Sequence, residues 1–171
     1  MWKKADIPTS AQRLQQEGYS RLTALVIANA GVENKEQAEE FLHSETVHNP
    51  AKIRNIEKVS ETIWDHIYRK EKICVFGDYD CDGVTGAAIL YLMLKRLGAD
   101  VMARLPDRIY EGYGISMEAI REEIALGTKL FITVDNGIKA IAEIEEIRRQ
   151  GCKSIVLDHH QPGEVLPDAD A

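Results

Sequence analysis

The chain has 171 residues, of which 44% are hydrophobic, so it is long enough to fold around a core of its own. Its formal net charge of -7 argues against a protein that coats nucleic acid in general. No stretch approaches the roughly 18 apolar residues of a membrane span, and the N-terminus lacks the apolar core of a secretion signal. The three cysteines form no CxxC pair, so we expect reduced thiols in a soluble, cytoplasmic protein.

Residues 1–70 are predicted to form a helical segment. Gly31 is expected to end a helix over 21–30, and Asn34 to Gln37 resemble a capping box that opens a second helix. A turn follows near Asn49 and Pro50. Two sets of apolar residues recur at helical spacing: Ala38, Phe41 and Leu42, and then Ile56, Val59, Ile63, Trp64 and Ile67.

Residues 71–171 change to an alternation of strand and helix patterns. We predict strands at 73–76, 101–105, 130–134 and 154–157, with helices at 84–97, 116–126 and 138–150. Such alternation is typical of an α/β fold, in which a parallel sheet carries helices on both faces. Ligands of such sheets bind beyond the carboxyl ends of the strands, at a topological switch point.

Acidic residues and histidines follow three of the predicted strands. They are Asp78, Asp80 and Asp82, then Asp135 in the motif Asp-Asn-Gly, and finally Asp158 with His159 and His160. Like charges at this density resist sharing one site unless a cation or a proton separates them. Carboxylate and imidazole ligands suit Mn²⁺, Mg²⁺ or Zn²⁺, and a cluster of this size could hold two ions. The pattern therefore predicts a metal site.

The first acidic motif partly matches two further kinds of site, and both matches fail. A calcium-binding loop would need a glutamate at its twelfth position, where Ile89 stands, and a helix rather than a strand before it. An aspartyl-phosphate phosphatase places its nucleophile directly after the strand, whereas Gly77, Asp78 and Tyr79 come between the strand and Asp80. That scheme also gives the paired histidines no role.

The segment from Arg104 to Gly114 admits two interpretations. It is either an ordinary surface loop with glycines for its turns, or a loop that faces the substrate. In the second case Arg108 could bind a phosphate through two hydrogen bonds, and Tyr113 could offer a face for stacking. The residue chemistry leaves both open.

Taken together, these motifs resemble the DHH phosphoesterase superfamily, named for the motif that stands here as Asp158-His159-His160. The segment GDYDCDGVTG resembles its first motif and VDNG its second. The segments EKICVFGDYDCDG and PDRIYEGYGIS, together with AEEFL in the helical region, are similar to the RecJ family of bacterial exonucleases.

The resemblance implies roles for individual residues. It assigns Asp78, Asp80, Asp82, Asp135 and His159 to Mn²⁺ or Mg²⁺, with one or two ions bound and Asp135 as the bridge between two. It makes His160 the contact to the scissile phosphate, gives Asp158 a catalytic or orienting role, and assigns Arg108, Tyr113 and Asn136 to the substrate. Phe76 departs from the pattern, because the superfamily often has a histidine there.

The resemblance also implies a function, namely 5′ to 3′ hydrolysis of single-stranded DNA in DNA repair and recombination. RecJ enzymes continue beyond the DHH motif into further domains. We therefore expect these 171 residues to be an N-terminal part with weak or no activity, partnered by C-terminal domains of the same protein and by single-stranded DNA. Two alternatives remain. One is a DHH hydrolase of nanoRNA, a cyclic dinucleotide or pyrophosphate, and the other is a non-catalytic module that binds DNA or a partner.

Overall fold

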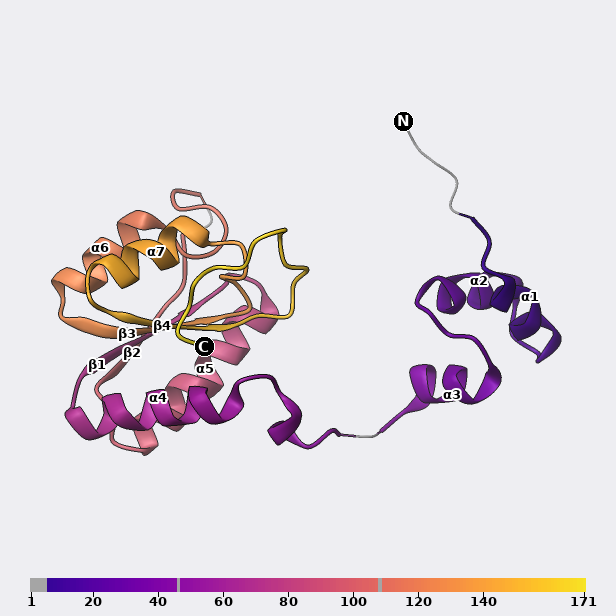
Figure 1. The fold of residues 1–171 in the computed structure, drawn as a ribbon, viewed down its shortest axis with the longest axis horizontal. Coiled ribbons are helices and arrows are strands. Elements are labelled where there is room, and N and C mark those ends of the chain that lie inside the picture. Colours follow the sequence, from indigo (N-terminus) through magenta and orange to yellow (C-terminus); the bar gives the residue numbers. More distant parts are fainter. Residues whose placement is uncertain (1–5, 46, 108) are drawn as a thin grey trace. The chain divides into compact units, whose positions relative to one another are not determined.

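The computed structural model describes residues 6–45, 47–107 and 109–171, which form two compact units, Met1–Asn49 and Pro50–Ala171 (Figure 1). This division precedes the predicted boundary between residues 70 and 71. Helix α4 (Ile56–Arg69) accounts for the difference, because Val59 and Ile63 on this helix belong to the buried core of the second unit.

The first unit contains helices α1 (Thr9–Gln16), α2 (Arg21–Asn29) and α3 (Lys35–His43). The predicted cap at Asn34 is confirmed, since its side chain accepts a hydrogen bond of 3.0 Å from the backbone N–H of Gln37. The predicted apolar face of α3 is wrong in part: Ala38 is buried, but 58% of Phe41 and 39% of Leu42 are exposed. A short helix needs little apolar surface to pack in so small a unit.

The second unit is built on a four-stranded parallel sheet with the order β2-β1-β3-β4. Its strands are β1 (Lys72–Gly77), β2 (Val101–Arg104), β3 (Thr128–Val134) and β4 (Lys153–Leu157). Its helices are the short 3-10 helix η1 (Pro50–Lys52), α4, α5 (Cys81–Arg96), α6 (Met117–Ala125) and α7 (Ile141–Arg149). The predicted α/β architecture is confirmed.

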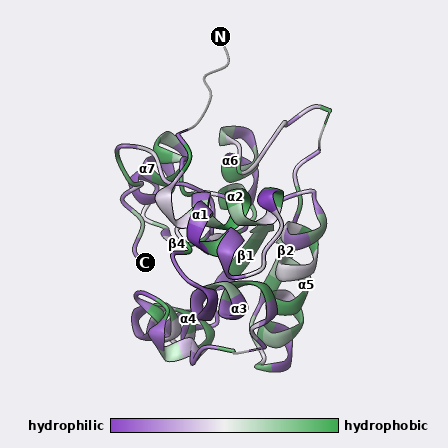
Figure 2. Ribbon diagram, turned by 90° about the vertical axis from the view of Figure 1, so that its right-hand side faces the viewer, coloured by the Kyte–Doolittle hydropathy of each residue, from purple (hydrophilic) through white to green (hydrophobic). Residues whose placement is uncertain are grey.

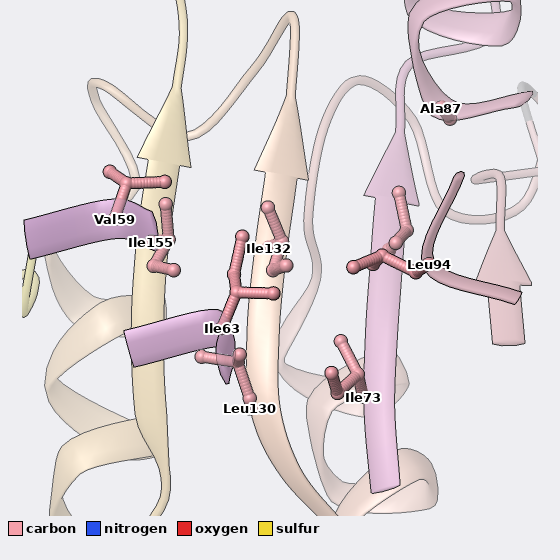
Figure 3. Close-up of a cluster of buried hydrophobic side chains, with 9 residues drawn as sticks. Val59, Ile63, Ile73, Ala87, Leu94, Leu130, Ile132 and Ile155 are labelled. Atoms are coloured by element: carbon pink, nitrogen blue, oxygen red, sulfur yellow. The ribbon is translucent and has the colours of Figure 1, made fainter. Parts of the chain in front are cut away.

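Successive residues of β1 point to opposite faces of the sheet, so each face has its own core. On one face Ile73 and Val75 pack with residues of α4 and α5, and Figure 3 shows Val59 and Ile63 of α4 over the neighbouring strands. On the other face Cys74 and Phe76 pack with residues of α6 and α7. Figure 1 shows the two helical layers on either side of the sheet.

The helices differ in how completely they are covered. Figure 2 shows hydrophobic and hydrophilic residues following one another along α5. This helix buries Ala87 and Leu94, whereas Ile89 remains 70% exposed. Trp64 of α4, predicted to belong to an apolar face, is 54% exposed. Within the described ranges of the chain, no helix combines the length and the apolar character needed to cross a membrane.

Candidate metal centre

The three acidic motifs meet at one edge of the sheet. Because the chain passes from β1 to β2 on one side and then to β3 on the other, the switch point lies between β1 and β3. Asp78 follows β1, Asp135 follows β3, and Asp158 follows the adjacent β4. The carboxyl ends of parallel strands lie at the same edge, so the topology brings together residues that are distant in sequence.

Helix α5 begins directly on top of these strand ends. Asp80 caps the helix, and its Oδ1 accepts a 3.1 Å hydrogen bond from the N–H of Gly83. A Cβ on Gly83 would lie 2.6 Å from the backbone nitrogen of Asp78, and one on Gly86 would lie 2.8 Å from the Val134 side chain. Only glycine permits this approach, which carries Asp80 and Asp82 to the sheet edge.

Asp135 and the next residue, Asn136, connect the end of β3 to both of its neighbouring strands. Its φ of 63° is in the left-handed region, and its N–H donates to the carbonyl oxygen of Leu157 at 2.8 Å. The side-chain amide of Asn136 donates to the carbonyl oxygens of Phe76 (3.1 Å) and Val134 (2.9 Å). Asn136 thus joins the ends of β1 and β3, and its part in substrate binding stays a prediction.

The side chains converge in two overlapping groups. Asp78, Asp80 and Asp135 each bring a carboxylate oxygen within 4.8 Å of the others, and ligand atoms of Asp135, His159 and His160 meet the same limit. Asp82 lies alongside, with its Oδ2 3.8 Å from His159 Nε2. All five predicted metal ligands are therefore close to one another, and Asp135 belongs to both groups.

The two histidines have different partners. His159 Nε2 lies 2.9 Å from Asp135 Oδ1, whereas His160 Nδ1 lies 2.8 Å from Asp158 Oδ1. Asp158 also accepts hydrogen bonds from the N–H groups of His160 and Ile138, each at 3.0 Å. Both oxygens of Asp158 are thus engaged, so this residue orients His160. The Ile138 contact was not predicted, because no sequence pattern marks a backbone donor.

These contacts shift the pKa values of three groups. Burial raises the pKa of the Asp135 carboxyl, and the negative charges of Asp82 and Asp80 raise it further. The Gly83 N–H lowers the pKa of Asp80 by binding its ionised form. The hydrogen bond to Asp158 raises the pKa of His160.

Several buried oxygens of the site accept no hydrogen bond of good geometry from the described residues. They are Oδ1 of Asp78, both carboxylate oxygens of Asp135 and Oδ1 of Asn136. Oδ1 of Asp135 is the one that His159 Nε2 approaches to 2.9 Å, whereas its Oδ2 has no such neighbour among the described residues. Buried carboxylate oxygens are costly unless a donor or a cation compensates for the lost water. Hard oxygen ligands with one or two imidazoles fit a divalent ion such as Mn²⁺ or Mg²⁺, so the residues present are suited to the predicted metal.

Tyr113 reaches the same centre from the loop after β2. Its hydroxyl donates to the carbonyl oxygen of Asp135 at 3.3 Å and lies 3.5 Å from the ring nitrogens of His160. Burial and the neighbouring aspartates raise its pKa to about 12. With Gly114 and Ile115 it lines a cleft of about 370 Å³ beside His160. Arg108, predicted to bind substrate with Tyr113, lies outside the described residues.

Residues 72–171 match the family model described as the N-terminal domain of the DHH family. The chain belongs to the DHH family. This confirms the resemblance that the three acidic motifs indicated.

Several of the relatives found carry the name RecJ. The single-stranded-DNA-specific exonuclease RecJ of Bacillus subtilis is 37% identical over 159 residues, which are 92% of this chain and 20% of that protein. The RecJ of Escherichia coli is 38% identical over 120 residues, or 70% of this chain and 21% of the relative. The chain thus spans about a fifth of the length of the curated relatives it matches.

Two solved structures share the fold. A crystal structure of exonuclease RecJ bound to manganese aligns with a TM-score of 0.65 and 40% identity, over 68% of this chain and 30% of that one. RecJ from Thermus thermophilus in complex with Mn²⁺ aligns with a TM-score of 0.62 and 29% identity, over 94% of this chain and 22% of that one.

Phe76 is the position at which the resemblance led us to expect a histidine. It is fully buried in the core beside α6 and α7. Its side chain offers no ligand atom. In this chain the ends of β1 and α5 therefore contribute carboxylates alone to the centre, and the imidazoles come from the loop after β4.

Proposed function

We propose that this chain carries the metal centre of a single-strand-specific DNA exonuclease of the RecJ type, which hydrolyses phosphodiester bonds with Mn²⁺ or Mg²⁺. The observation that carries the proposal is the buried carboxylate of Asp135, which is shared by two groups of candidate ligands and accepts no hydrogen bond of good geometry from the described residues, with His159 Nε2 approaching its Oδ1. The RecJ relatives and the manganese-bound RecJ structures support the choice of substrate and ion.

The residues would divide between two ion positions. Asp78, Asp80 and Asp135 would hold one ion, and Asp135 with His159 would hold the other, with Asp82 beside His159. When bound, such ions neutralise charge on the phosphoryl oxygens and lower the pKa of a coordinated water, which supplies the nucleophile.

The remaining residues would bind and orient the substrate. Asp158 fixes the ring of His160 through Nδ1 and favours the protonated imidazole, which can donate a hydrogen bond to a phosphate oxygen. Tyr113, like any tyrosine with a pKa of 10 or higher, keeps its proton at neutral pH and remains a hydrogen-bond donor; burial and the neighbouring aspartates raise its pKa further, to about 12. Both residues line the cleft, and the Tyr113 hydroxyl lies 3.5 Å from a ring nitrogen of His160.

The proposal includes digestion from the 5′ end, in the cytoplasm, during DNA repair and recombination. The support is the resemblance to RecJ in the motifs GDYDCDG and EGYG, together with the relatives named as single-stranded-DNA-specific exonucleases. The chain covers only part of those relatives. We therefore propose the complete exonuclease reaction for this centre within a longer chain.

The test combines metal binding with cleavage. Calorimetric titration should show Mn²⁺ binding to the wild type, which Asp80→Ala and Asp135→Asn each weaken by about 100-fold or more. A 5′-labelled single strand and the matching duplex should then be incubated with Mn²⁺ and each protein, as residues 1–171, which we expect to have weak or no activity alone, and within a longer chain that continues into the further domains expected of a RecJ enzyme. Cleavage of the single strand alone, absent from the Asp80→Ala control, would support the proposal. Mn²⁺ binding with cleavage only of dinucleotides or pyrophosphate would replace it with another DHH activity.

A further inference from the structure

A charged network lies at the carboxyl end of β2, beside the metal centre but separate from its ligands. Arg104, the last residue of β2, places Nη2 2.7 Å from Glu111 Oε1 and Nη1 2.6 Å from Glu122 Oε2. Glu123, which is buried, lies 3.6 Å from the same Nη1. Because only 19% of the Arg104 side chain is exposed, its ion pairs are shielded from water and salt more than ordinary surface pairs.

Glu111 connects this arginine to the loop between β2 and α6. While Oε1 binds Arg104, Oε2 accepts a 2.7 Å hydrogen bond from the backbone N–H of Asp107. The Asp107 carbonyl oxygen in turn accepts from the N–H groups of Glu111 (2.8 Å) and Gly112 (3.2 Å). One carboxylate thus closes the loop on itself and fastens it to a strand of the sheet.

The glycines that follow turn the chain toward the metal centre. Gly112 and Gly114 have φ values of 81° and 73°, a region that L side chains rarely adopt. Tyr113 stands between them, with its hydroxyl at Asp135 and His160. The segment Glu111-Gly112-Tyr113-Gly114 therefore consists of an anchor, a turn, a functional side chain and a second turn.

We propose that Arg104 and Glu111 are positioning residues, which hold Tyr113 over the metal centre and fix one wall of the cleft beside it. Gly114 and Ile115 line the cleft next to Tyr113 in the chain, and Ile138 and Lys139 line it from the segment after β3. The nucleotide next to the scissile phosphate would occupy this cleft. This inference rests on the proposed nuclease function, and it adds residues that do not touch the ions.

Glu122 provides a matched control for Glu111. Both carboxylates bind the same guanidinium at similar distances, but Glu122 lies on α6, is 54% exposed and forms its ion pair without a hydrogen bond to the described part of the loop. Replacing either glutamate with glutamine removes one of the negative charges that bind Arg104 and keeps the size of the replaced side chain. Only the Glu111 change should release the loop.

The experiment compares wild type, Glu111→Gln and Glu122→Gln by hydrogen exchange and Mn²⁺ calorimetry, and by cleavage of a 5′-labelled single strand within a longer chain that continues into the further domains expected of a RecJ enzyme. In Glu111→Gln the amides of residues 107 and 109–112 should exchange about 10-fold faster. Its kcat should fall about 10-fold, since small displacements at a reacting centre reduce rates strongly, while Mn²⁺ affinity stays within about 2-fold. Glu122→Gln should match the wild type. If Glu111→Gln folds poorly, Arg104→Lys takes its place. This variant keeps the positive charge but loses the contact of one guanidinium with two glutamates, so it should show the faster exchange and lower kcat expected of Glu111→Gln.

The possible outcomes separate the positioning role from the nuclease function. Equal loop exchange in the two glutamine variants would overturn the positioning role, whatever the cleavage data show. Absence of cleavage by the wild-type longer chain would count against the proposed function, while the exchange data would still decide whether Glu111 holds the loop. A loss of Mn²⁺ affinity in Glu111→Gln equal to its loss of kcat would also overturn the inference, because the residue would then act on the ions.

Discussion

Asp135 combines the features of a metal ligand with a cost to the metal-free fold. Its carboxylate is 6% exposed, and its pKa is raised by burial and by two neighbouring aspartates. When the pKa of a carboxyl group is higher in the folded state than in the unfolded state, the free energy of unfolding falls as the pH rises from the unfolded pKa through the folded one. At neutral pH the folded protein still has this loss of stability. The ion that would offset this cost is the one the site is suited to bind.

We therefore expect Asp135→Asn to stabilise the metal-free protein while it destroys metal binding. In EDTA at neutral pH the variant should be more stable by about 1 kcal/mol, because a buried charge is replaced by a neutral amide that tolerates the same backbone conformation. Its Mn²⁺ affinity should fall by about 100-fold or more, since even residues that only orient ligands contribute about 10- to 100-fold. Thermal unfolding in EDTA and calorimetry provide the two measurements. Equal metal affinity in both proteins would remove Asp135 from the site.

His160 should titrate above the ordinary pKa of imidazole because of its contact with Asp158. The pair stabilises the fold fully below the unfolded pKa of histidine, and this contribution is lost as the pH rises through the folded pKa. Replacing Asp158 with Asn removes the charge, so the His160 titration should move down toward its ordinary value. NMR titration of the histidine rings in EDTA measures this shift. A midpoint that does not change would show that Asp158 has no control over His160.

The residue types of the site could be predicted from the sequence, whereas their contacts could not. Three strand-like runs that end in Asp or His indicate the candidate ligands, because parallel strands share an edge. The use of the Asn136 amide by two strand carbonyls depends on the spacing of β1 and β3, which no local pattern encodes. The positive φ of Asp135 likewise arises from its tertiary contact with Leu157.

At the level of elements, strand positions agree closely with prediction, while helix starts differ. Helix α5 begins at Cys81 rather than at residue 84, because Asp80 acts as its cap and also as a site residue. Helix α7 begins at Ile141 rather than at residue 138, because a turn comes first, in which the N–H of Ala140 donates to the carbonyl oxygen of Gly137 at 3.0 Å. Both helix starts therefore depend on the segments that carry the site.

The close approach of α5 to the strand ends gives a direct test at Gly83. A methyl group there would meet the backbone of Asp78 at 2.6 Å, so Gly83→Ala must displace either the helix or the strand end. We expect a loss of about 1–3 kcal/mol in stability and a parallel loss of Mn²⁺ affinity, as for overpacking in a core. Gly163→Ala is the control, since its added Cβ would make an ordinary contact of 3.6 Å. Normal metal binding by Gly83→Ala would contradict the importance of this approach.

For the whole molecule, the division into two units places every described ligand in Pro50–Ala171. Both cores that support the sheet also lie there, while the core formed by α1, α2 and α3 is confined to the first unit. The second unit should therefore fold and bind metal without the first. The change of sequence pattern near residue 70 instead predicts a domain that starts at residue 71, and such a domain would lack α4.

Two truncated chains distinguish these boundaries. Residues 50–171 should unfold cooperatively and bind Mn²⁺ within about 2-fold of the full chain, because distant, independent parts contribute additively. Residues 71–171 lack Val59 and Ile63, and the burial of each side chain contributes about 1.5–3 kcal/mol, a large part of a typical domain's net stability. Removing α4 also leaves Leu130, Ile132 and Ile155 without their cover, as Figure 3 makes clear. We expect this shorter chain to lose cooperative unfolding and Mn²⁺ binding, as measured by circular dichroism and calorimetry. If residues 71–171 equal residues 50–171 in both measurements, α4 belongs functionally with the first unit, and the division at residue 50 does not define the metal-binding domain.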